Sequence, residues 1–207
     1  MQLKELSERT RVSPASIKFY LREGLLPAGR SVHATRSEYS EHHVSRLELI
    51  QALRNVVGLP IAKVSSLLRM ADDGAPRLEL LAAVQRTVLG LDEVSTEHGD
   101  LRTPGGDAVV RFRNRPDVPS DARNALNAHL SLMESLGVPA DNELLDAYSQ
   151  AVDSIAAVNI SATTAPEDVN QLIMTAAVGM HLHGQLVLKL LALAQASHAI
   201  RRYEKDA

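Results

Sequence analysis

Apolar side chains at the start of the chain recur every three or four residues, which is the spacing of one face of a helix. Leu3 and Leu6 predict a short helix over residues 3–10. Ile17 and Leu21 predict a second helix, which a tight turn separates from the first. The pattern therefore predicts two short helices joined by a turn.

The residues at the ends of the second helix fit this prediction. Ser13 can accept a hydrogen bond from a free N–H of the first turn, and Pro14 stands at the first helical position, where its missing N–H costs nothing. Gly24 is placed to end the helix in the left-handed conformation. Two short helices with a tight turn form a helix-turn-helix, whose second helix normally enters the major groove of DNA.

A basic hairpin is expected after the second helix. Residues 25–39 cannot be helical throughout, because Pro27 and Gly29 interrupt them near their start. We interpret a basic hairpin in this position as a wing that lies on DNA phosphates. Its candidate residues are Arg30, His33, Arg36 and Tyr39.

Two further helices complete the N-terminal part of the chain. Ser40 is the expected cap of a helix that ends before Gly58, and Pro60 starts the next helix. Their apolar stripes predict a small helical core. The inward positions are Val44, Leu47, Ile50, Leu53, Val57, Ile61, Val64, Leu67 and Leu68.

The order of these elements is similar to that of a known family. The segments "SPASIKFYLREGLLP" and "EYSEHHVSRLELIQALRNVVGLPIAKVSSLL", with the basic wing between them, resemble the DNA-binding domain of the MerR family of bacterial regulators. The resemblance covers residues 1–70 and implies a winged helix-turn-helix domain that binds double-stranded DNA. Activators of this family untwist and bend promoter DNA so that RNA polymerase can engage, which makes the polymerase an implied partner.

Individual residues match the family's DNA-contacting positions. Lys18 stands where the family has an arginine, Tyr20 matches its second tyrosine, and Arg54 matches a basic position of the third helix that touches the DNA backbone. The wing departs from the family pattern. When Tyr39 is aligned with the tyrosine of the family's wing, Arg36 stands one residue before the family's arginine, and a small bulge would restore its reach to the DNA backbone. The expected DNA contacts are Ser13, Ser16, Lys18, Tyr20, Arg22, Arg36, Tyr39 and Arg54.

Beyond residue 70 the pattern predicts a mainly α chain without repeats. Residues 71–97 are expected to form a connecting helix that dimerises, and residues 98–207 a helical C-terminal domain that is a candidate for effector binding. Residues 98–120 are interpreted as a loop with a short strand at Val109 and Val110. The apolar stripe of the connecting helix is Leu78, Leu81, Val84, Val88 and Leu91.

Three more helices are predicted in the C-terminal domain. They cover residues 121–136, residues 141–160 and residues 166–203, the last with a bend at Gly179 or Gly184. The last helix is long enough to cross a membrane, but polar side chains interrupt it, which favours a buried helix or a dimer face instead. The interrupting residues are His181, His183, Gln185, Lys189 and Gln195.

No catalytic or metal-binding constellation is expected in the C-terminal domain. His181 and His183 are two residues apart, so they point to opposite sides of a helix and cannot jointly bind one metal ion. Acidic residues at the start of the helix over residues 141–160 favour its dipole. The basic run over residues 111–115 is interpreted as a solvated loop. The sequence therefore predicts neither an enzyme nor a bound cofactor.

Charge and composition narrow the range of candidate signals. Residues 1–70 carry eleven Lys or Arg against six Asp or Glu, whereas the rest carries eleven against nineteen, so the N-terminal part is expected to meet an anion. The absence of cysteine excludes thiolate metal sensors and iron–sulfur sensors, and a content of 3% aromatics is poorly suited to caging a cation. A largely apolar small molecule therefore remains as the candidate effector. The alternative is a plain dimer core that binds no ligand. The expected lining of its site is Met180, His181, His183 and Gln185.

The sequence thus predicts a transcriptional regulator of the MerR type that binds a palindromic promoter site as a homodimer and responds to a small apolar ligand. Charged residues stand where a signal peptide would have its apolar core, which favours a cytoplasmic protein. Two alternatives stay open. One is an effector-free repressor whose helical body only dimerises. The other is a helical-bundle enzyme or ligand carrier with an accessory DNA-binding head.

Overall fold

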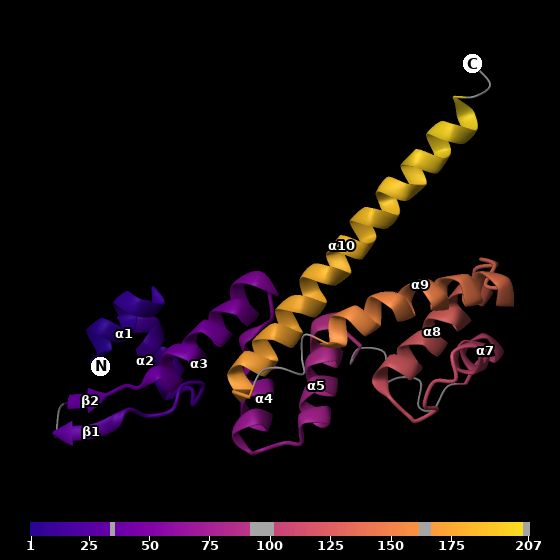
Figure 1. Ribbon diagram of the computed structural model, residues 1–207. Coiled ribbons are helices and arrows are strands. Elements are labelled where there is room, and N and C mark those ends of the chain that lie inside the picture. Colours follow the sequence, from indigo (N-terminus) through magenta and orange to yellow (C-terminus); the bar gives the residue numbers. More distant parts are fainter. Residues whose placement is uncertain (34–35, 92–101, 162–166, 205–207) are drawn as a thin grey trace.

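The computed structural model describes residues 1–33, 36–91, 102–161 and 167–204, which are mainly helical apart from one hairpin (Figure 1). The N-terminal elements are α1 (Leu3–Thr10), α2 (Pro14–Arg22), β1 (Arg30–His33), β2 (Arg36–Glu38), α3 (Glu41–Gln51), the π-helical turn η1 (Ala52–Val56) and α4 (Ile61–Asp72). The elements that follow are α5 (Arg77–Leu89), α7 (Pro104–Phe112), α8 (Asp121–Ser135), α9 (Asn142–Ser161) and α10 (Val169–Tyr203). The predicted fold class, mainly α with a winged N-terminal domain, is confirmed.

The helix-turn-helix forms as its sequence predicts. The Ser13 hydroxyl accepts a hydrogen bond from Ser16 N–H at 3.1 Å, which satisfies a free donor at the start of α2. Gly24 follows α2 with a φ of 70°, a left-handed conformation that glycine adopts without strain. A small core holds α1, α2 and α3 together. Its buried members are Leu6, Val12, Ile17, Leu26, Tyr39, Val44 and Leu47.

The strands β1 and β2 form the predicted wing, and the first residue of the chain fixes its base. The strands pair antiparallel, with Arg30 opposite Glu38 and an irregular register after Ser31. Tyr39 N–H donates to Met1 O at 2.8 Å, and the Met1 amino group donates to Tyr39 O at 2.9 Å. These two hydrogen bonds tie the end of the wing to the start of α1.

The N-terminal half of α10 packs into the same core as the helices that follow the wing, and we call this the shared core. Ile173, Ala176 and Ala177 of α10 are buried against α3, η1 and α5. Asn170 Nδ2 also donates to Ser45 Oγ of α3 at 3.0 Å, so the last helix returns to the N-terminal domain. The other buried members are Leu25, Leu49, Ile50, Leu53, Leu59, Val64, Leu67, Leu68, Leu80, Ala83, Val84 and Leu172.

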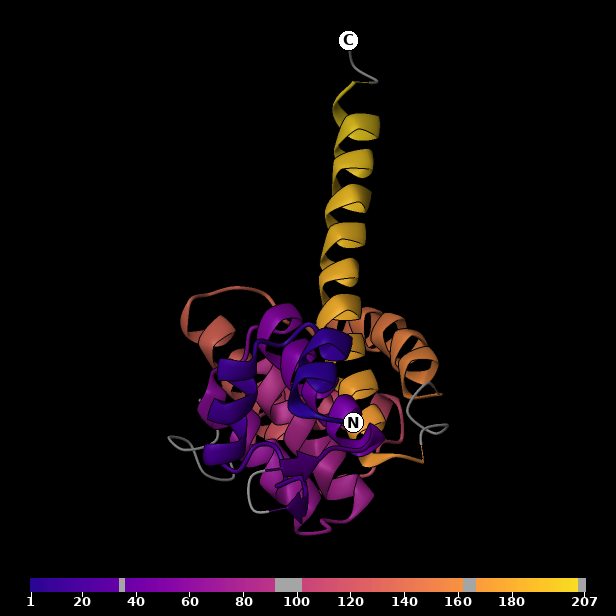
Figure 2. The same cartoon turned by 90° about the vertical axis from the view of Figure 1, so that its left-hand side faces the viewer.

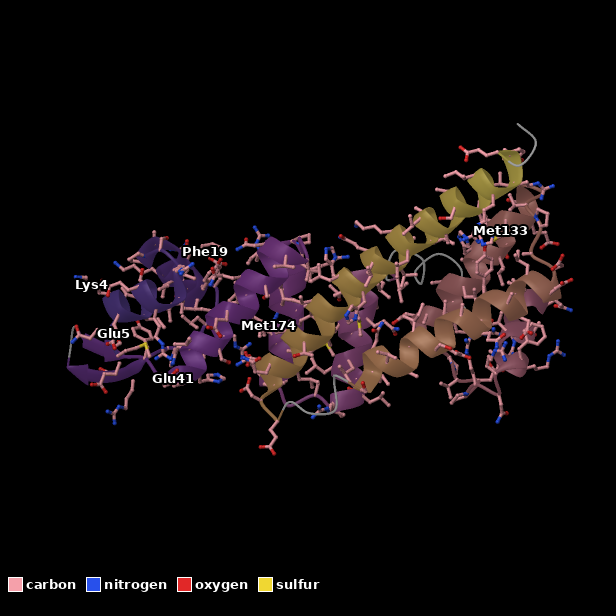
Figure 3. The ribbon with its side chains drawn as sticks, turned by 45° about the horizontal axis from the view of Figure 1, so that its top comes forward. Lys4, Glu5, Phe19, Glu41, Met133 and Met174 are labelled. Atoms are coloured by element: carbon pink, nitrogen blue, oxygen red, sulfur yellow. The ribbon has the colours of Figure 1, made fainter. Side chains whose placement is uncertain are left out.

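A third, smaller core joins α7, α8 and α9 at the far end of the molecule from the wing. It consists of Val109, Leu130 and Leu145, one residue from each helix. Figure 3 shows Met133 of α8 at this end and Met174 of α10 nearer the N-terminal domain. The two methionines pack against the smaller core and the shared core respectively.

Helix α7 corrects one prediction. The predicted loop over residues 98–120 is wrong for residues 104–112, where Val109 and Val110 are helical and not in a strand, while residues 113–120 are non-helical as predicted and residues 98–101 lie outside the described residues. Pro104 stands at the first helical position, and the Thr103 hydroxyl accepts from Gly106 N–H at 3.0 Å. A Cβ on Gly106 would lie 2.0 Å from Asn127 Oδ1 of α8. Gly106, which in the sequence suggests an interruption of helical structure, therefore lies in the first turn of α7 and lets α7 approach α8.

The basic run over residues 111–115 is only in part the solvated loop that the sequence predicts, because Arg113 and Arg115 are anchored to α9 whereas Arg111 and Asn114 are exposed. Arg113 Nη2 donates to Asp146 Oδ1 at 2.6 Å, and Arg115 Nη2 donates to Asp153 Oδ1 at 2.5 Å. Because both carboxylates belong to α9, the two ion pairs hold the end of α7 against that helix.

The C-terminal half of α10 stands clear of the rest of the molecule (Figures 1 and 2). The helix runs unbroken and straight through Gly179 and Gly184, so the predicted bend is absent from α10. By length and composition α10 also qualifies as a candidate membrane span, and little of its most apolar window is buried. The predicted helical ends near residues 136, 160 and 203 are confirmed within one residue by α8, α9 and α10.

Truncating Ile173 should destabilise the N-terminal domain together with α10, because both contribute to the shared core. We expect Ile173→Ala to lower the free energy of unfolding by about 2–5 kcal/mol, the usual cost of a large core cavity. Urea denaturation followed by circular dichroism measures the loss. Val118→Ala, at a side chain that is 62% exposed, is the matched control and should change little. Unchanged amide exchange in α3 of Ile173→Ala would contradict the shared core.

Candidate nucleic-acid interface

Helix α2 turns its apolar side chains toward the core and its basic ones toward solvent. Ile17 is fully buried, whereas Lys18 and Arg22 are exposed. Lys18 has no hydrogen bond or ion pair with any residue that the structure describes. Its ammonium group is therefore available to an external anion or base edge.

Arg22 is oriented by its neighbours. Its guanidinium carbon lies 5.5 Å from the centroid of the Phe19 ring, and its Nε lies 3.5 Å from Glu23 Oε1. The side chain remains exposed, so neither contact removes it from solvent. Stacking on an aromatic ring limits the freedom of the arginine and reduces the entropy that it loses on binding.

The start of α2 is a second part of the exposed surface. Ser13 Oγ and Ser16 Oγ lie 2.9 Å apart. Pro14 has no N–H, Ser16 N–H donates to Ser13 Oγ and Ile17 N–H donates to Ser13 O, which leaves one N–H of the first turn, that of Ala15, free among the described contacts. A free helix N-terminus attracts phosphate. Arg11, which the sequence reasoning did not include, is exposed in the turn just before this cap and has a φ of 56°. The signal that points to it is a basic residue directly ahead of a capped recognition helix.

The two tyrosines among the predicted contacts also support the domain. Tyr39 is buried, and its ring centroid lies 5.2 Å from that of His43. Tyr20 is half-buried and packs against both the small N-terminal core and the shared core. Contact of either residue with DNA stays a prediction, and the packing explains why each position holds a large ring.

The basic side chains of the wing and of η1 have different surroundings. Arg30 Nη2 pairs with Glu38 Oε2 across the wing at 2.8 Å. Arg54 is exposed, and its Nη1 donates to Leu59 O at 3.0 Å, which closes the turn into α4. The backbone of Arg36 lies in β2, but its side chain lies outside the described residues. The described positive charge of the wing, that of Arg30, is therefore already paired with a carboxylate on the facing strand.

His43 connects the wing to α3 through a partly buried hydrogen bond. Ser40 N–H donates to His43 Nδ1 at 3.0 Å, so the ring takes the place that glutamate usually has in a capping box. This bond requires Nδ1 without a proton. Burial lowers the pKa of His43, and the carbonyls of Ala28 and Pro27 offset the effect only in part. The neutral ring therefore stabilises the start of α3.

A separate candidate site is an apolar groove between α5, α9 and α10, which we call the α9–α10 groove. Its volume is about 730 Å³. Met180 and His183, two of the predicted effector residues, line it. His181 and Gln185 are not among its lining residues, and their side-chain nitrogens lie 2.9 Å apart. In the described ranges, no three side chains of His, Asp or Glu gather to hold a metal ion.

Comparisons with known proteins agree with the geometry of the N-terminal domain. Residues 1–71 match the family model of MerR HTH family regulatory proteins, so the predicted resemblance is confirmed for this domain. The chain is also similar to the crystal structure of SCO5550, a candidate transcriptional regulator from Streptomyces coelicolor A3(2). That similarity covers 98% of both chains, with a TM-score of 0.62 and 27% sequence identity. No curated protein matches the chain.

The neutral state of His43 predicts a pH-dependent stability of the N-terminal domain. The unfolded chain binds a proton near the ordinary histidine pKa of about 6.5, whereas the folded ring binds it only at lower pH. The contribution to stability is therefore complete above pH 6.5 and is lost as the pH falls toward the lowered pKa. We therefore expect the urea concentration at half-unfolding to be lower at about pH 5.5 than at about pH 7.5.

The matched variant is His43→Asn, which keeps an acceptor near the position of Nδ1 but does not titrate. It should show a smaller drop between the same two pH values. Parallel pH profiles for the two proteins would contradict the assignment of the effect to His43.

Proposed function

We propose that this chain, whose N-terminal domain belongs to the MerR helix-turn-helix family, is a transcriptional regulator that binds promoter DNA in a sequence-specific manner. The observation that carries the proposal is the outer face of α2, where Lys18 and Arg22, four residues apart, are both exposed. In this arrangement the two side chains reach base edges in the major groove. The helix N-terminus and Arg11 bind phosphates and set the position of α2.

The proposal includes a homodimer and a palindromic site. One short α2 contacts few base pairs, and two copies related by a two-fold axis read two half-sites at a fixed spacing. RNA polymerase at the same promoter is the proposed partner of the DNA-bound protein. We place the protein in the cytoplasm with the DNA that it binds.

We further propose that a small, largely apolar molecule controls the regulator from the α9–α10 groove. Pockets of about 300–1,000 Å³ hold most small ligands, and the groove has a volume of about 730 Å³. Ile155 and Val187 supply apolar walls, while His183 and Asn159 supply groups that can fix an orientation by hydrogen bonds. An effector-free regulator is the alternative, and it predicts that no compound bound in the groove changes DNA affinity.

Lys18→Ala should weaken binding to the operator by about 1–3 kcal/mol and relax specificity at one base pair, if Lys18 reads a base. The operator is obtained by selecting bound fragments from a random DNA pool, and affinity is measured by fluorescence anisotropy at several salt concentrations. If Lys18 instead holds a phosphate, all sequences should weaken alike, and the slope of log affinity against log salt should fall by about 1.

Arg111→Ala is the matched control for this experiment. It removes one exposed positive charge from α7, far from α2, and should leave both affinity and salt slope close to those of the unchanged protein. Equal affinity of Lys18→Ala, Arg22→Ala and Arg111→Ala for the operator would show that α2 is not the recognition helix.

The effector proposal is tested by thermal-shift measurements with a panel of medium-chain alcohols and carboxylic acids. A compound present at a hundred times its Kd should stabilise the protein by about 2.7 kcal/mol. His183→Ala should reduce that shift, whereas His181→Ala should not, because only His183 lines the groove. A larger loss in His181→Ala than in His183→Ala would place the ligand elsewhere.

A further inference from the structure

The wall that α10 contributes to the α9–α10 groove carries two glycines in the middle of a long helix. Thr175, Gly179 and His183 line the groove and follow one another in steps of four, so they share one side of α10, and Gly184 lines it beside them. Glycine inside a helix is less favourable than alanine, because its backbone loses more freedom on folding. A bend does not account for these glycines, because α10 runs straight through both (Figure 1).

Packing within the chain does not account for the two glycines either. A Cβ atom on Gly179 or Gly184 would meet no atom of the described chain within 4 Å, apart from its own stretch of helix. Gly106 of α7 differs, because a Cβ atom there would collide with Asn127 of α8. The glycines of α10 therefore leave bare backbone facing open space in the groove, where an occupant can lie directly against the helix.

The lining of the groove is free of acidic and strongly basic side chains. None of its described lining residues is Asp, Glu, Lys or Arg, and its polar members are Gln85, Asn159, Thr175 and His183. A ligand that carries a charge would give up its hydration there without gaining a fixed counter-ion, which is costly. A hydroxyl or carbonyl group meets both hydrogen-bond donors and acceptors on these side chains. The groove therefore favours an uncharged ligand.

These polar side chains lack partners and lie at separate points of the groove. Thr175, Asn159 and His183 make no side-chain hydrogen bond with any residue that the structure describes, and Thr175 and Asn159 are half-buried. Thr175 and His183 are eight positions apart on α10, a distance of roughly 12 Å along the helix axis. A ligand that satisfies both groups is therefore elongated and carries a hydrogen-bonding group near each end.

We propose that the α9–α10 groove binds an elongated, uncharged molecule that has a hydrogen-bonding group near each end and lies against α10 at Gly179 and Gly184. This inference rests on the proposed control by a small molecule, and it names the chemical class of that molecule. Thr175 takes one polar end and His183 takes the other, while Met180 and Ile155 pack against the apolar middle.

The end of the groove at Thr175 adjoins the shared core. Ala176, the next residue, lines the groove and is also a buried member of that core. A ligand bound at Thr175 thus contacts the part of α10 that packs against α3 and η1. This contact gives the ligand a direct route to the N-terminal domain.

A helix of a second copy is the other occupant that an apolar groove could have. The backbone N–H and C=O groups of such a helix are already bonded to one another. It therefore offers Thr175 and Asn159 fewer hydrogen-bond partners than a small polar molecule does, and we favour the small molecule.

Three probes of similar length and different charge test the ligand class. They are decanediol, decanedioate and decanediamine, each with its two functional groups at the ends of the chain. At about pH 7.5 the diol is neutral, the dioate is anionic and the diamine is cationic. We expect decanediol alone to raise the melting temperature, and its affinity by titration calorimetry to exceed that of either ion by about ten-fold or more, because the ions lose hydration without gaining a counter-ion. Equal or tighter binding of an ion would overturn the inference and leave effector control intact, whereas no binding of any probe would overturn both.

Filling the space at the glycines tests where the ligand lies. Gly179→Ala and Gly184→Ala each add one carbon atom to the wall of the groove, and Val158→Leu adds one at an exposed position of α9 outside the lining. Without ligand, both alanine variants should melt at a higher temperature, because alanine favours the helix. They should bind decanediol several-fold more weakly, whereas Val158→Leu should bind it as the unchanged chain does. Unchanged binding in both alanine variants, or a lower melting temperature, would overturn the proposal.

Light scattering on the same variants separates a ligand from a second copy. The mass of both alanine variants in solution should equal that of the unchanged chain. A smaller mass would show that another copy packs on the glycines, and the proposal would then be wrong.

The polar end at Thr175 has its own measurement. Thr175→Val removes a hydroxyl at nearly constant size and should weaken decanediol binding several-fold, and Thr87→Val, on α5 outside the lining, is the matched control. Equal affinity of the two valine variants for decanediol would overturn the assignment of two polar ends. An unchanged chain that binds decanediol but selects no DNA sequence would instead refute the proposed DNA-binding function and leave this inference standing.

Discussion

The packing of the first turns of α10 against α3, η1 and α5 is the contact on which the rest of the structure depends. Ile173, Ala176 and Ala177 fill a core that also holds Leu53 of η1. The last helix in the sequence is therefore part of the foundation of the N-terminal domain. A winged helix-turn-helix is too small to bury much apolar surface alone, and α10 supplies the missing part.

This contact makes α10 a rigid extension of the DNA-binding domain. The Asn170–Ser45 hydrogen bond fixes the base of the helix on α3, and the unbroken helix carries that orientation to residue 203. A change in the direction of the distal half would move α3 and the wing with it, because close-packed cores transmit displacement.

Local sequence signals were sufficient to predict the N-terminal domain. Much of the rest depends on packing between residues that are distant in the sequence, and it could not be predicted in this way. Ser13, Pro14 and Gly24 act within one turn of the chain, so their meaning does not depend on the fold. Helix α7 could not be read in the same way, because Gly106 suits a helix only when Asn127 lies against it. The burial of Tyr39 and the return of α10 to α3 likewise follow from contacts between distant residues. In the candidate effector site, spacing separated His181 from His183, but only the structure assigns His183 to the groove.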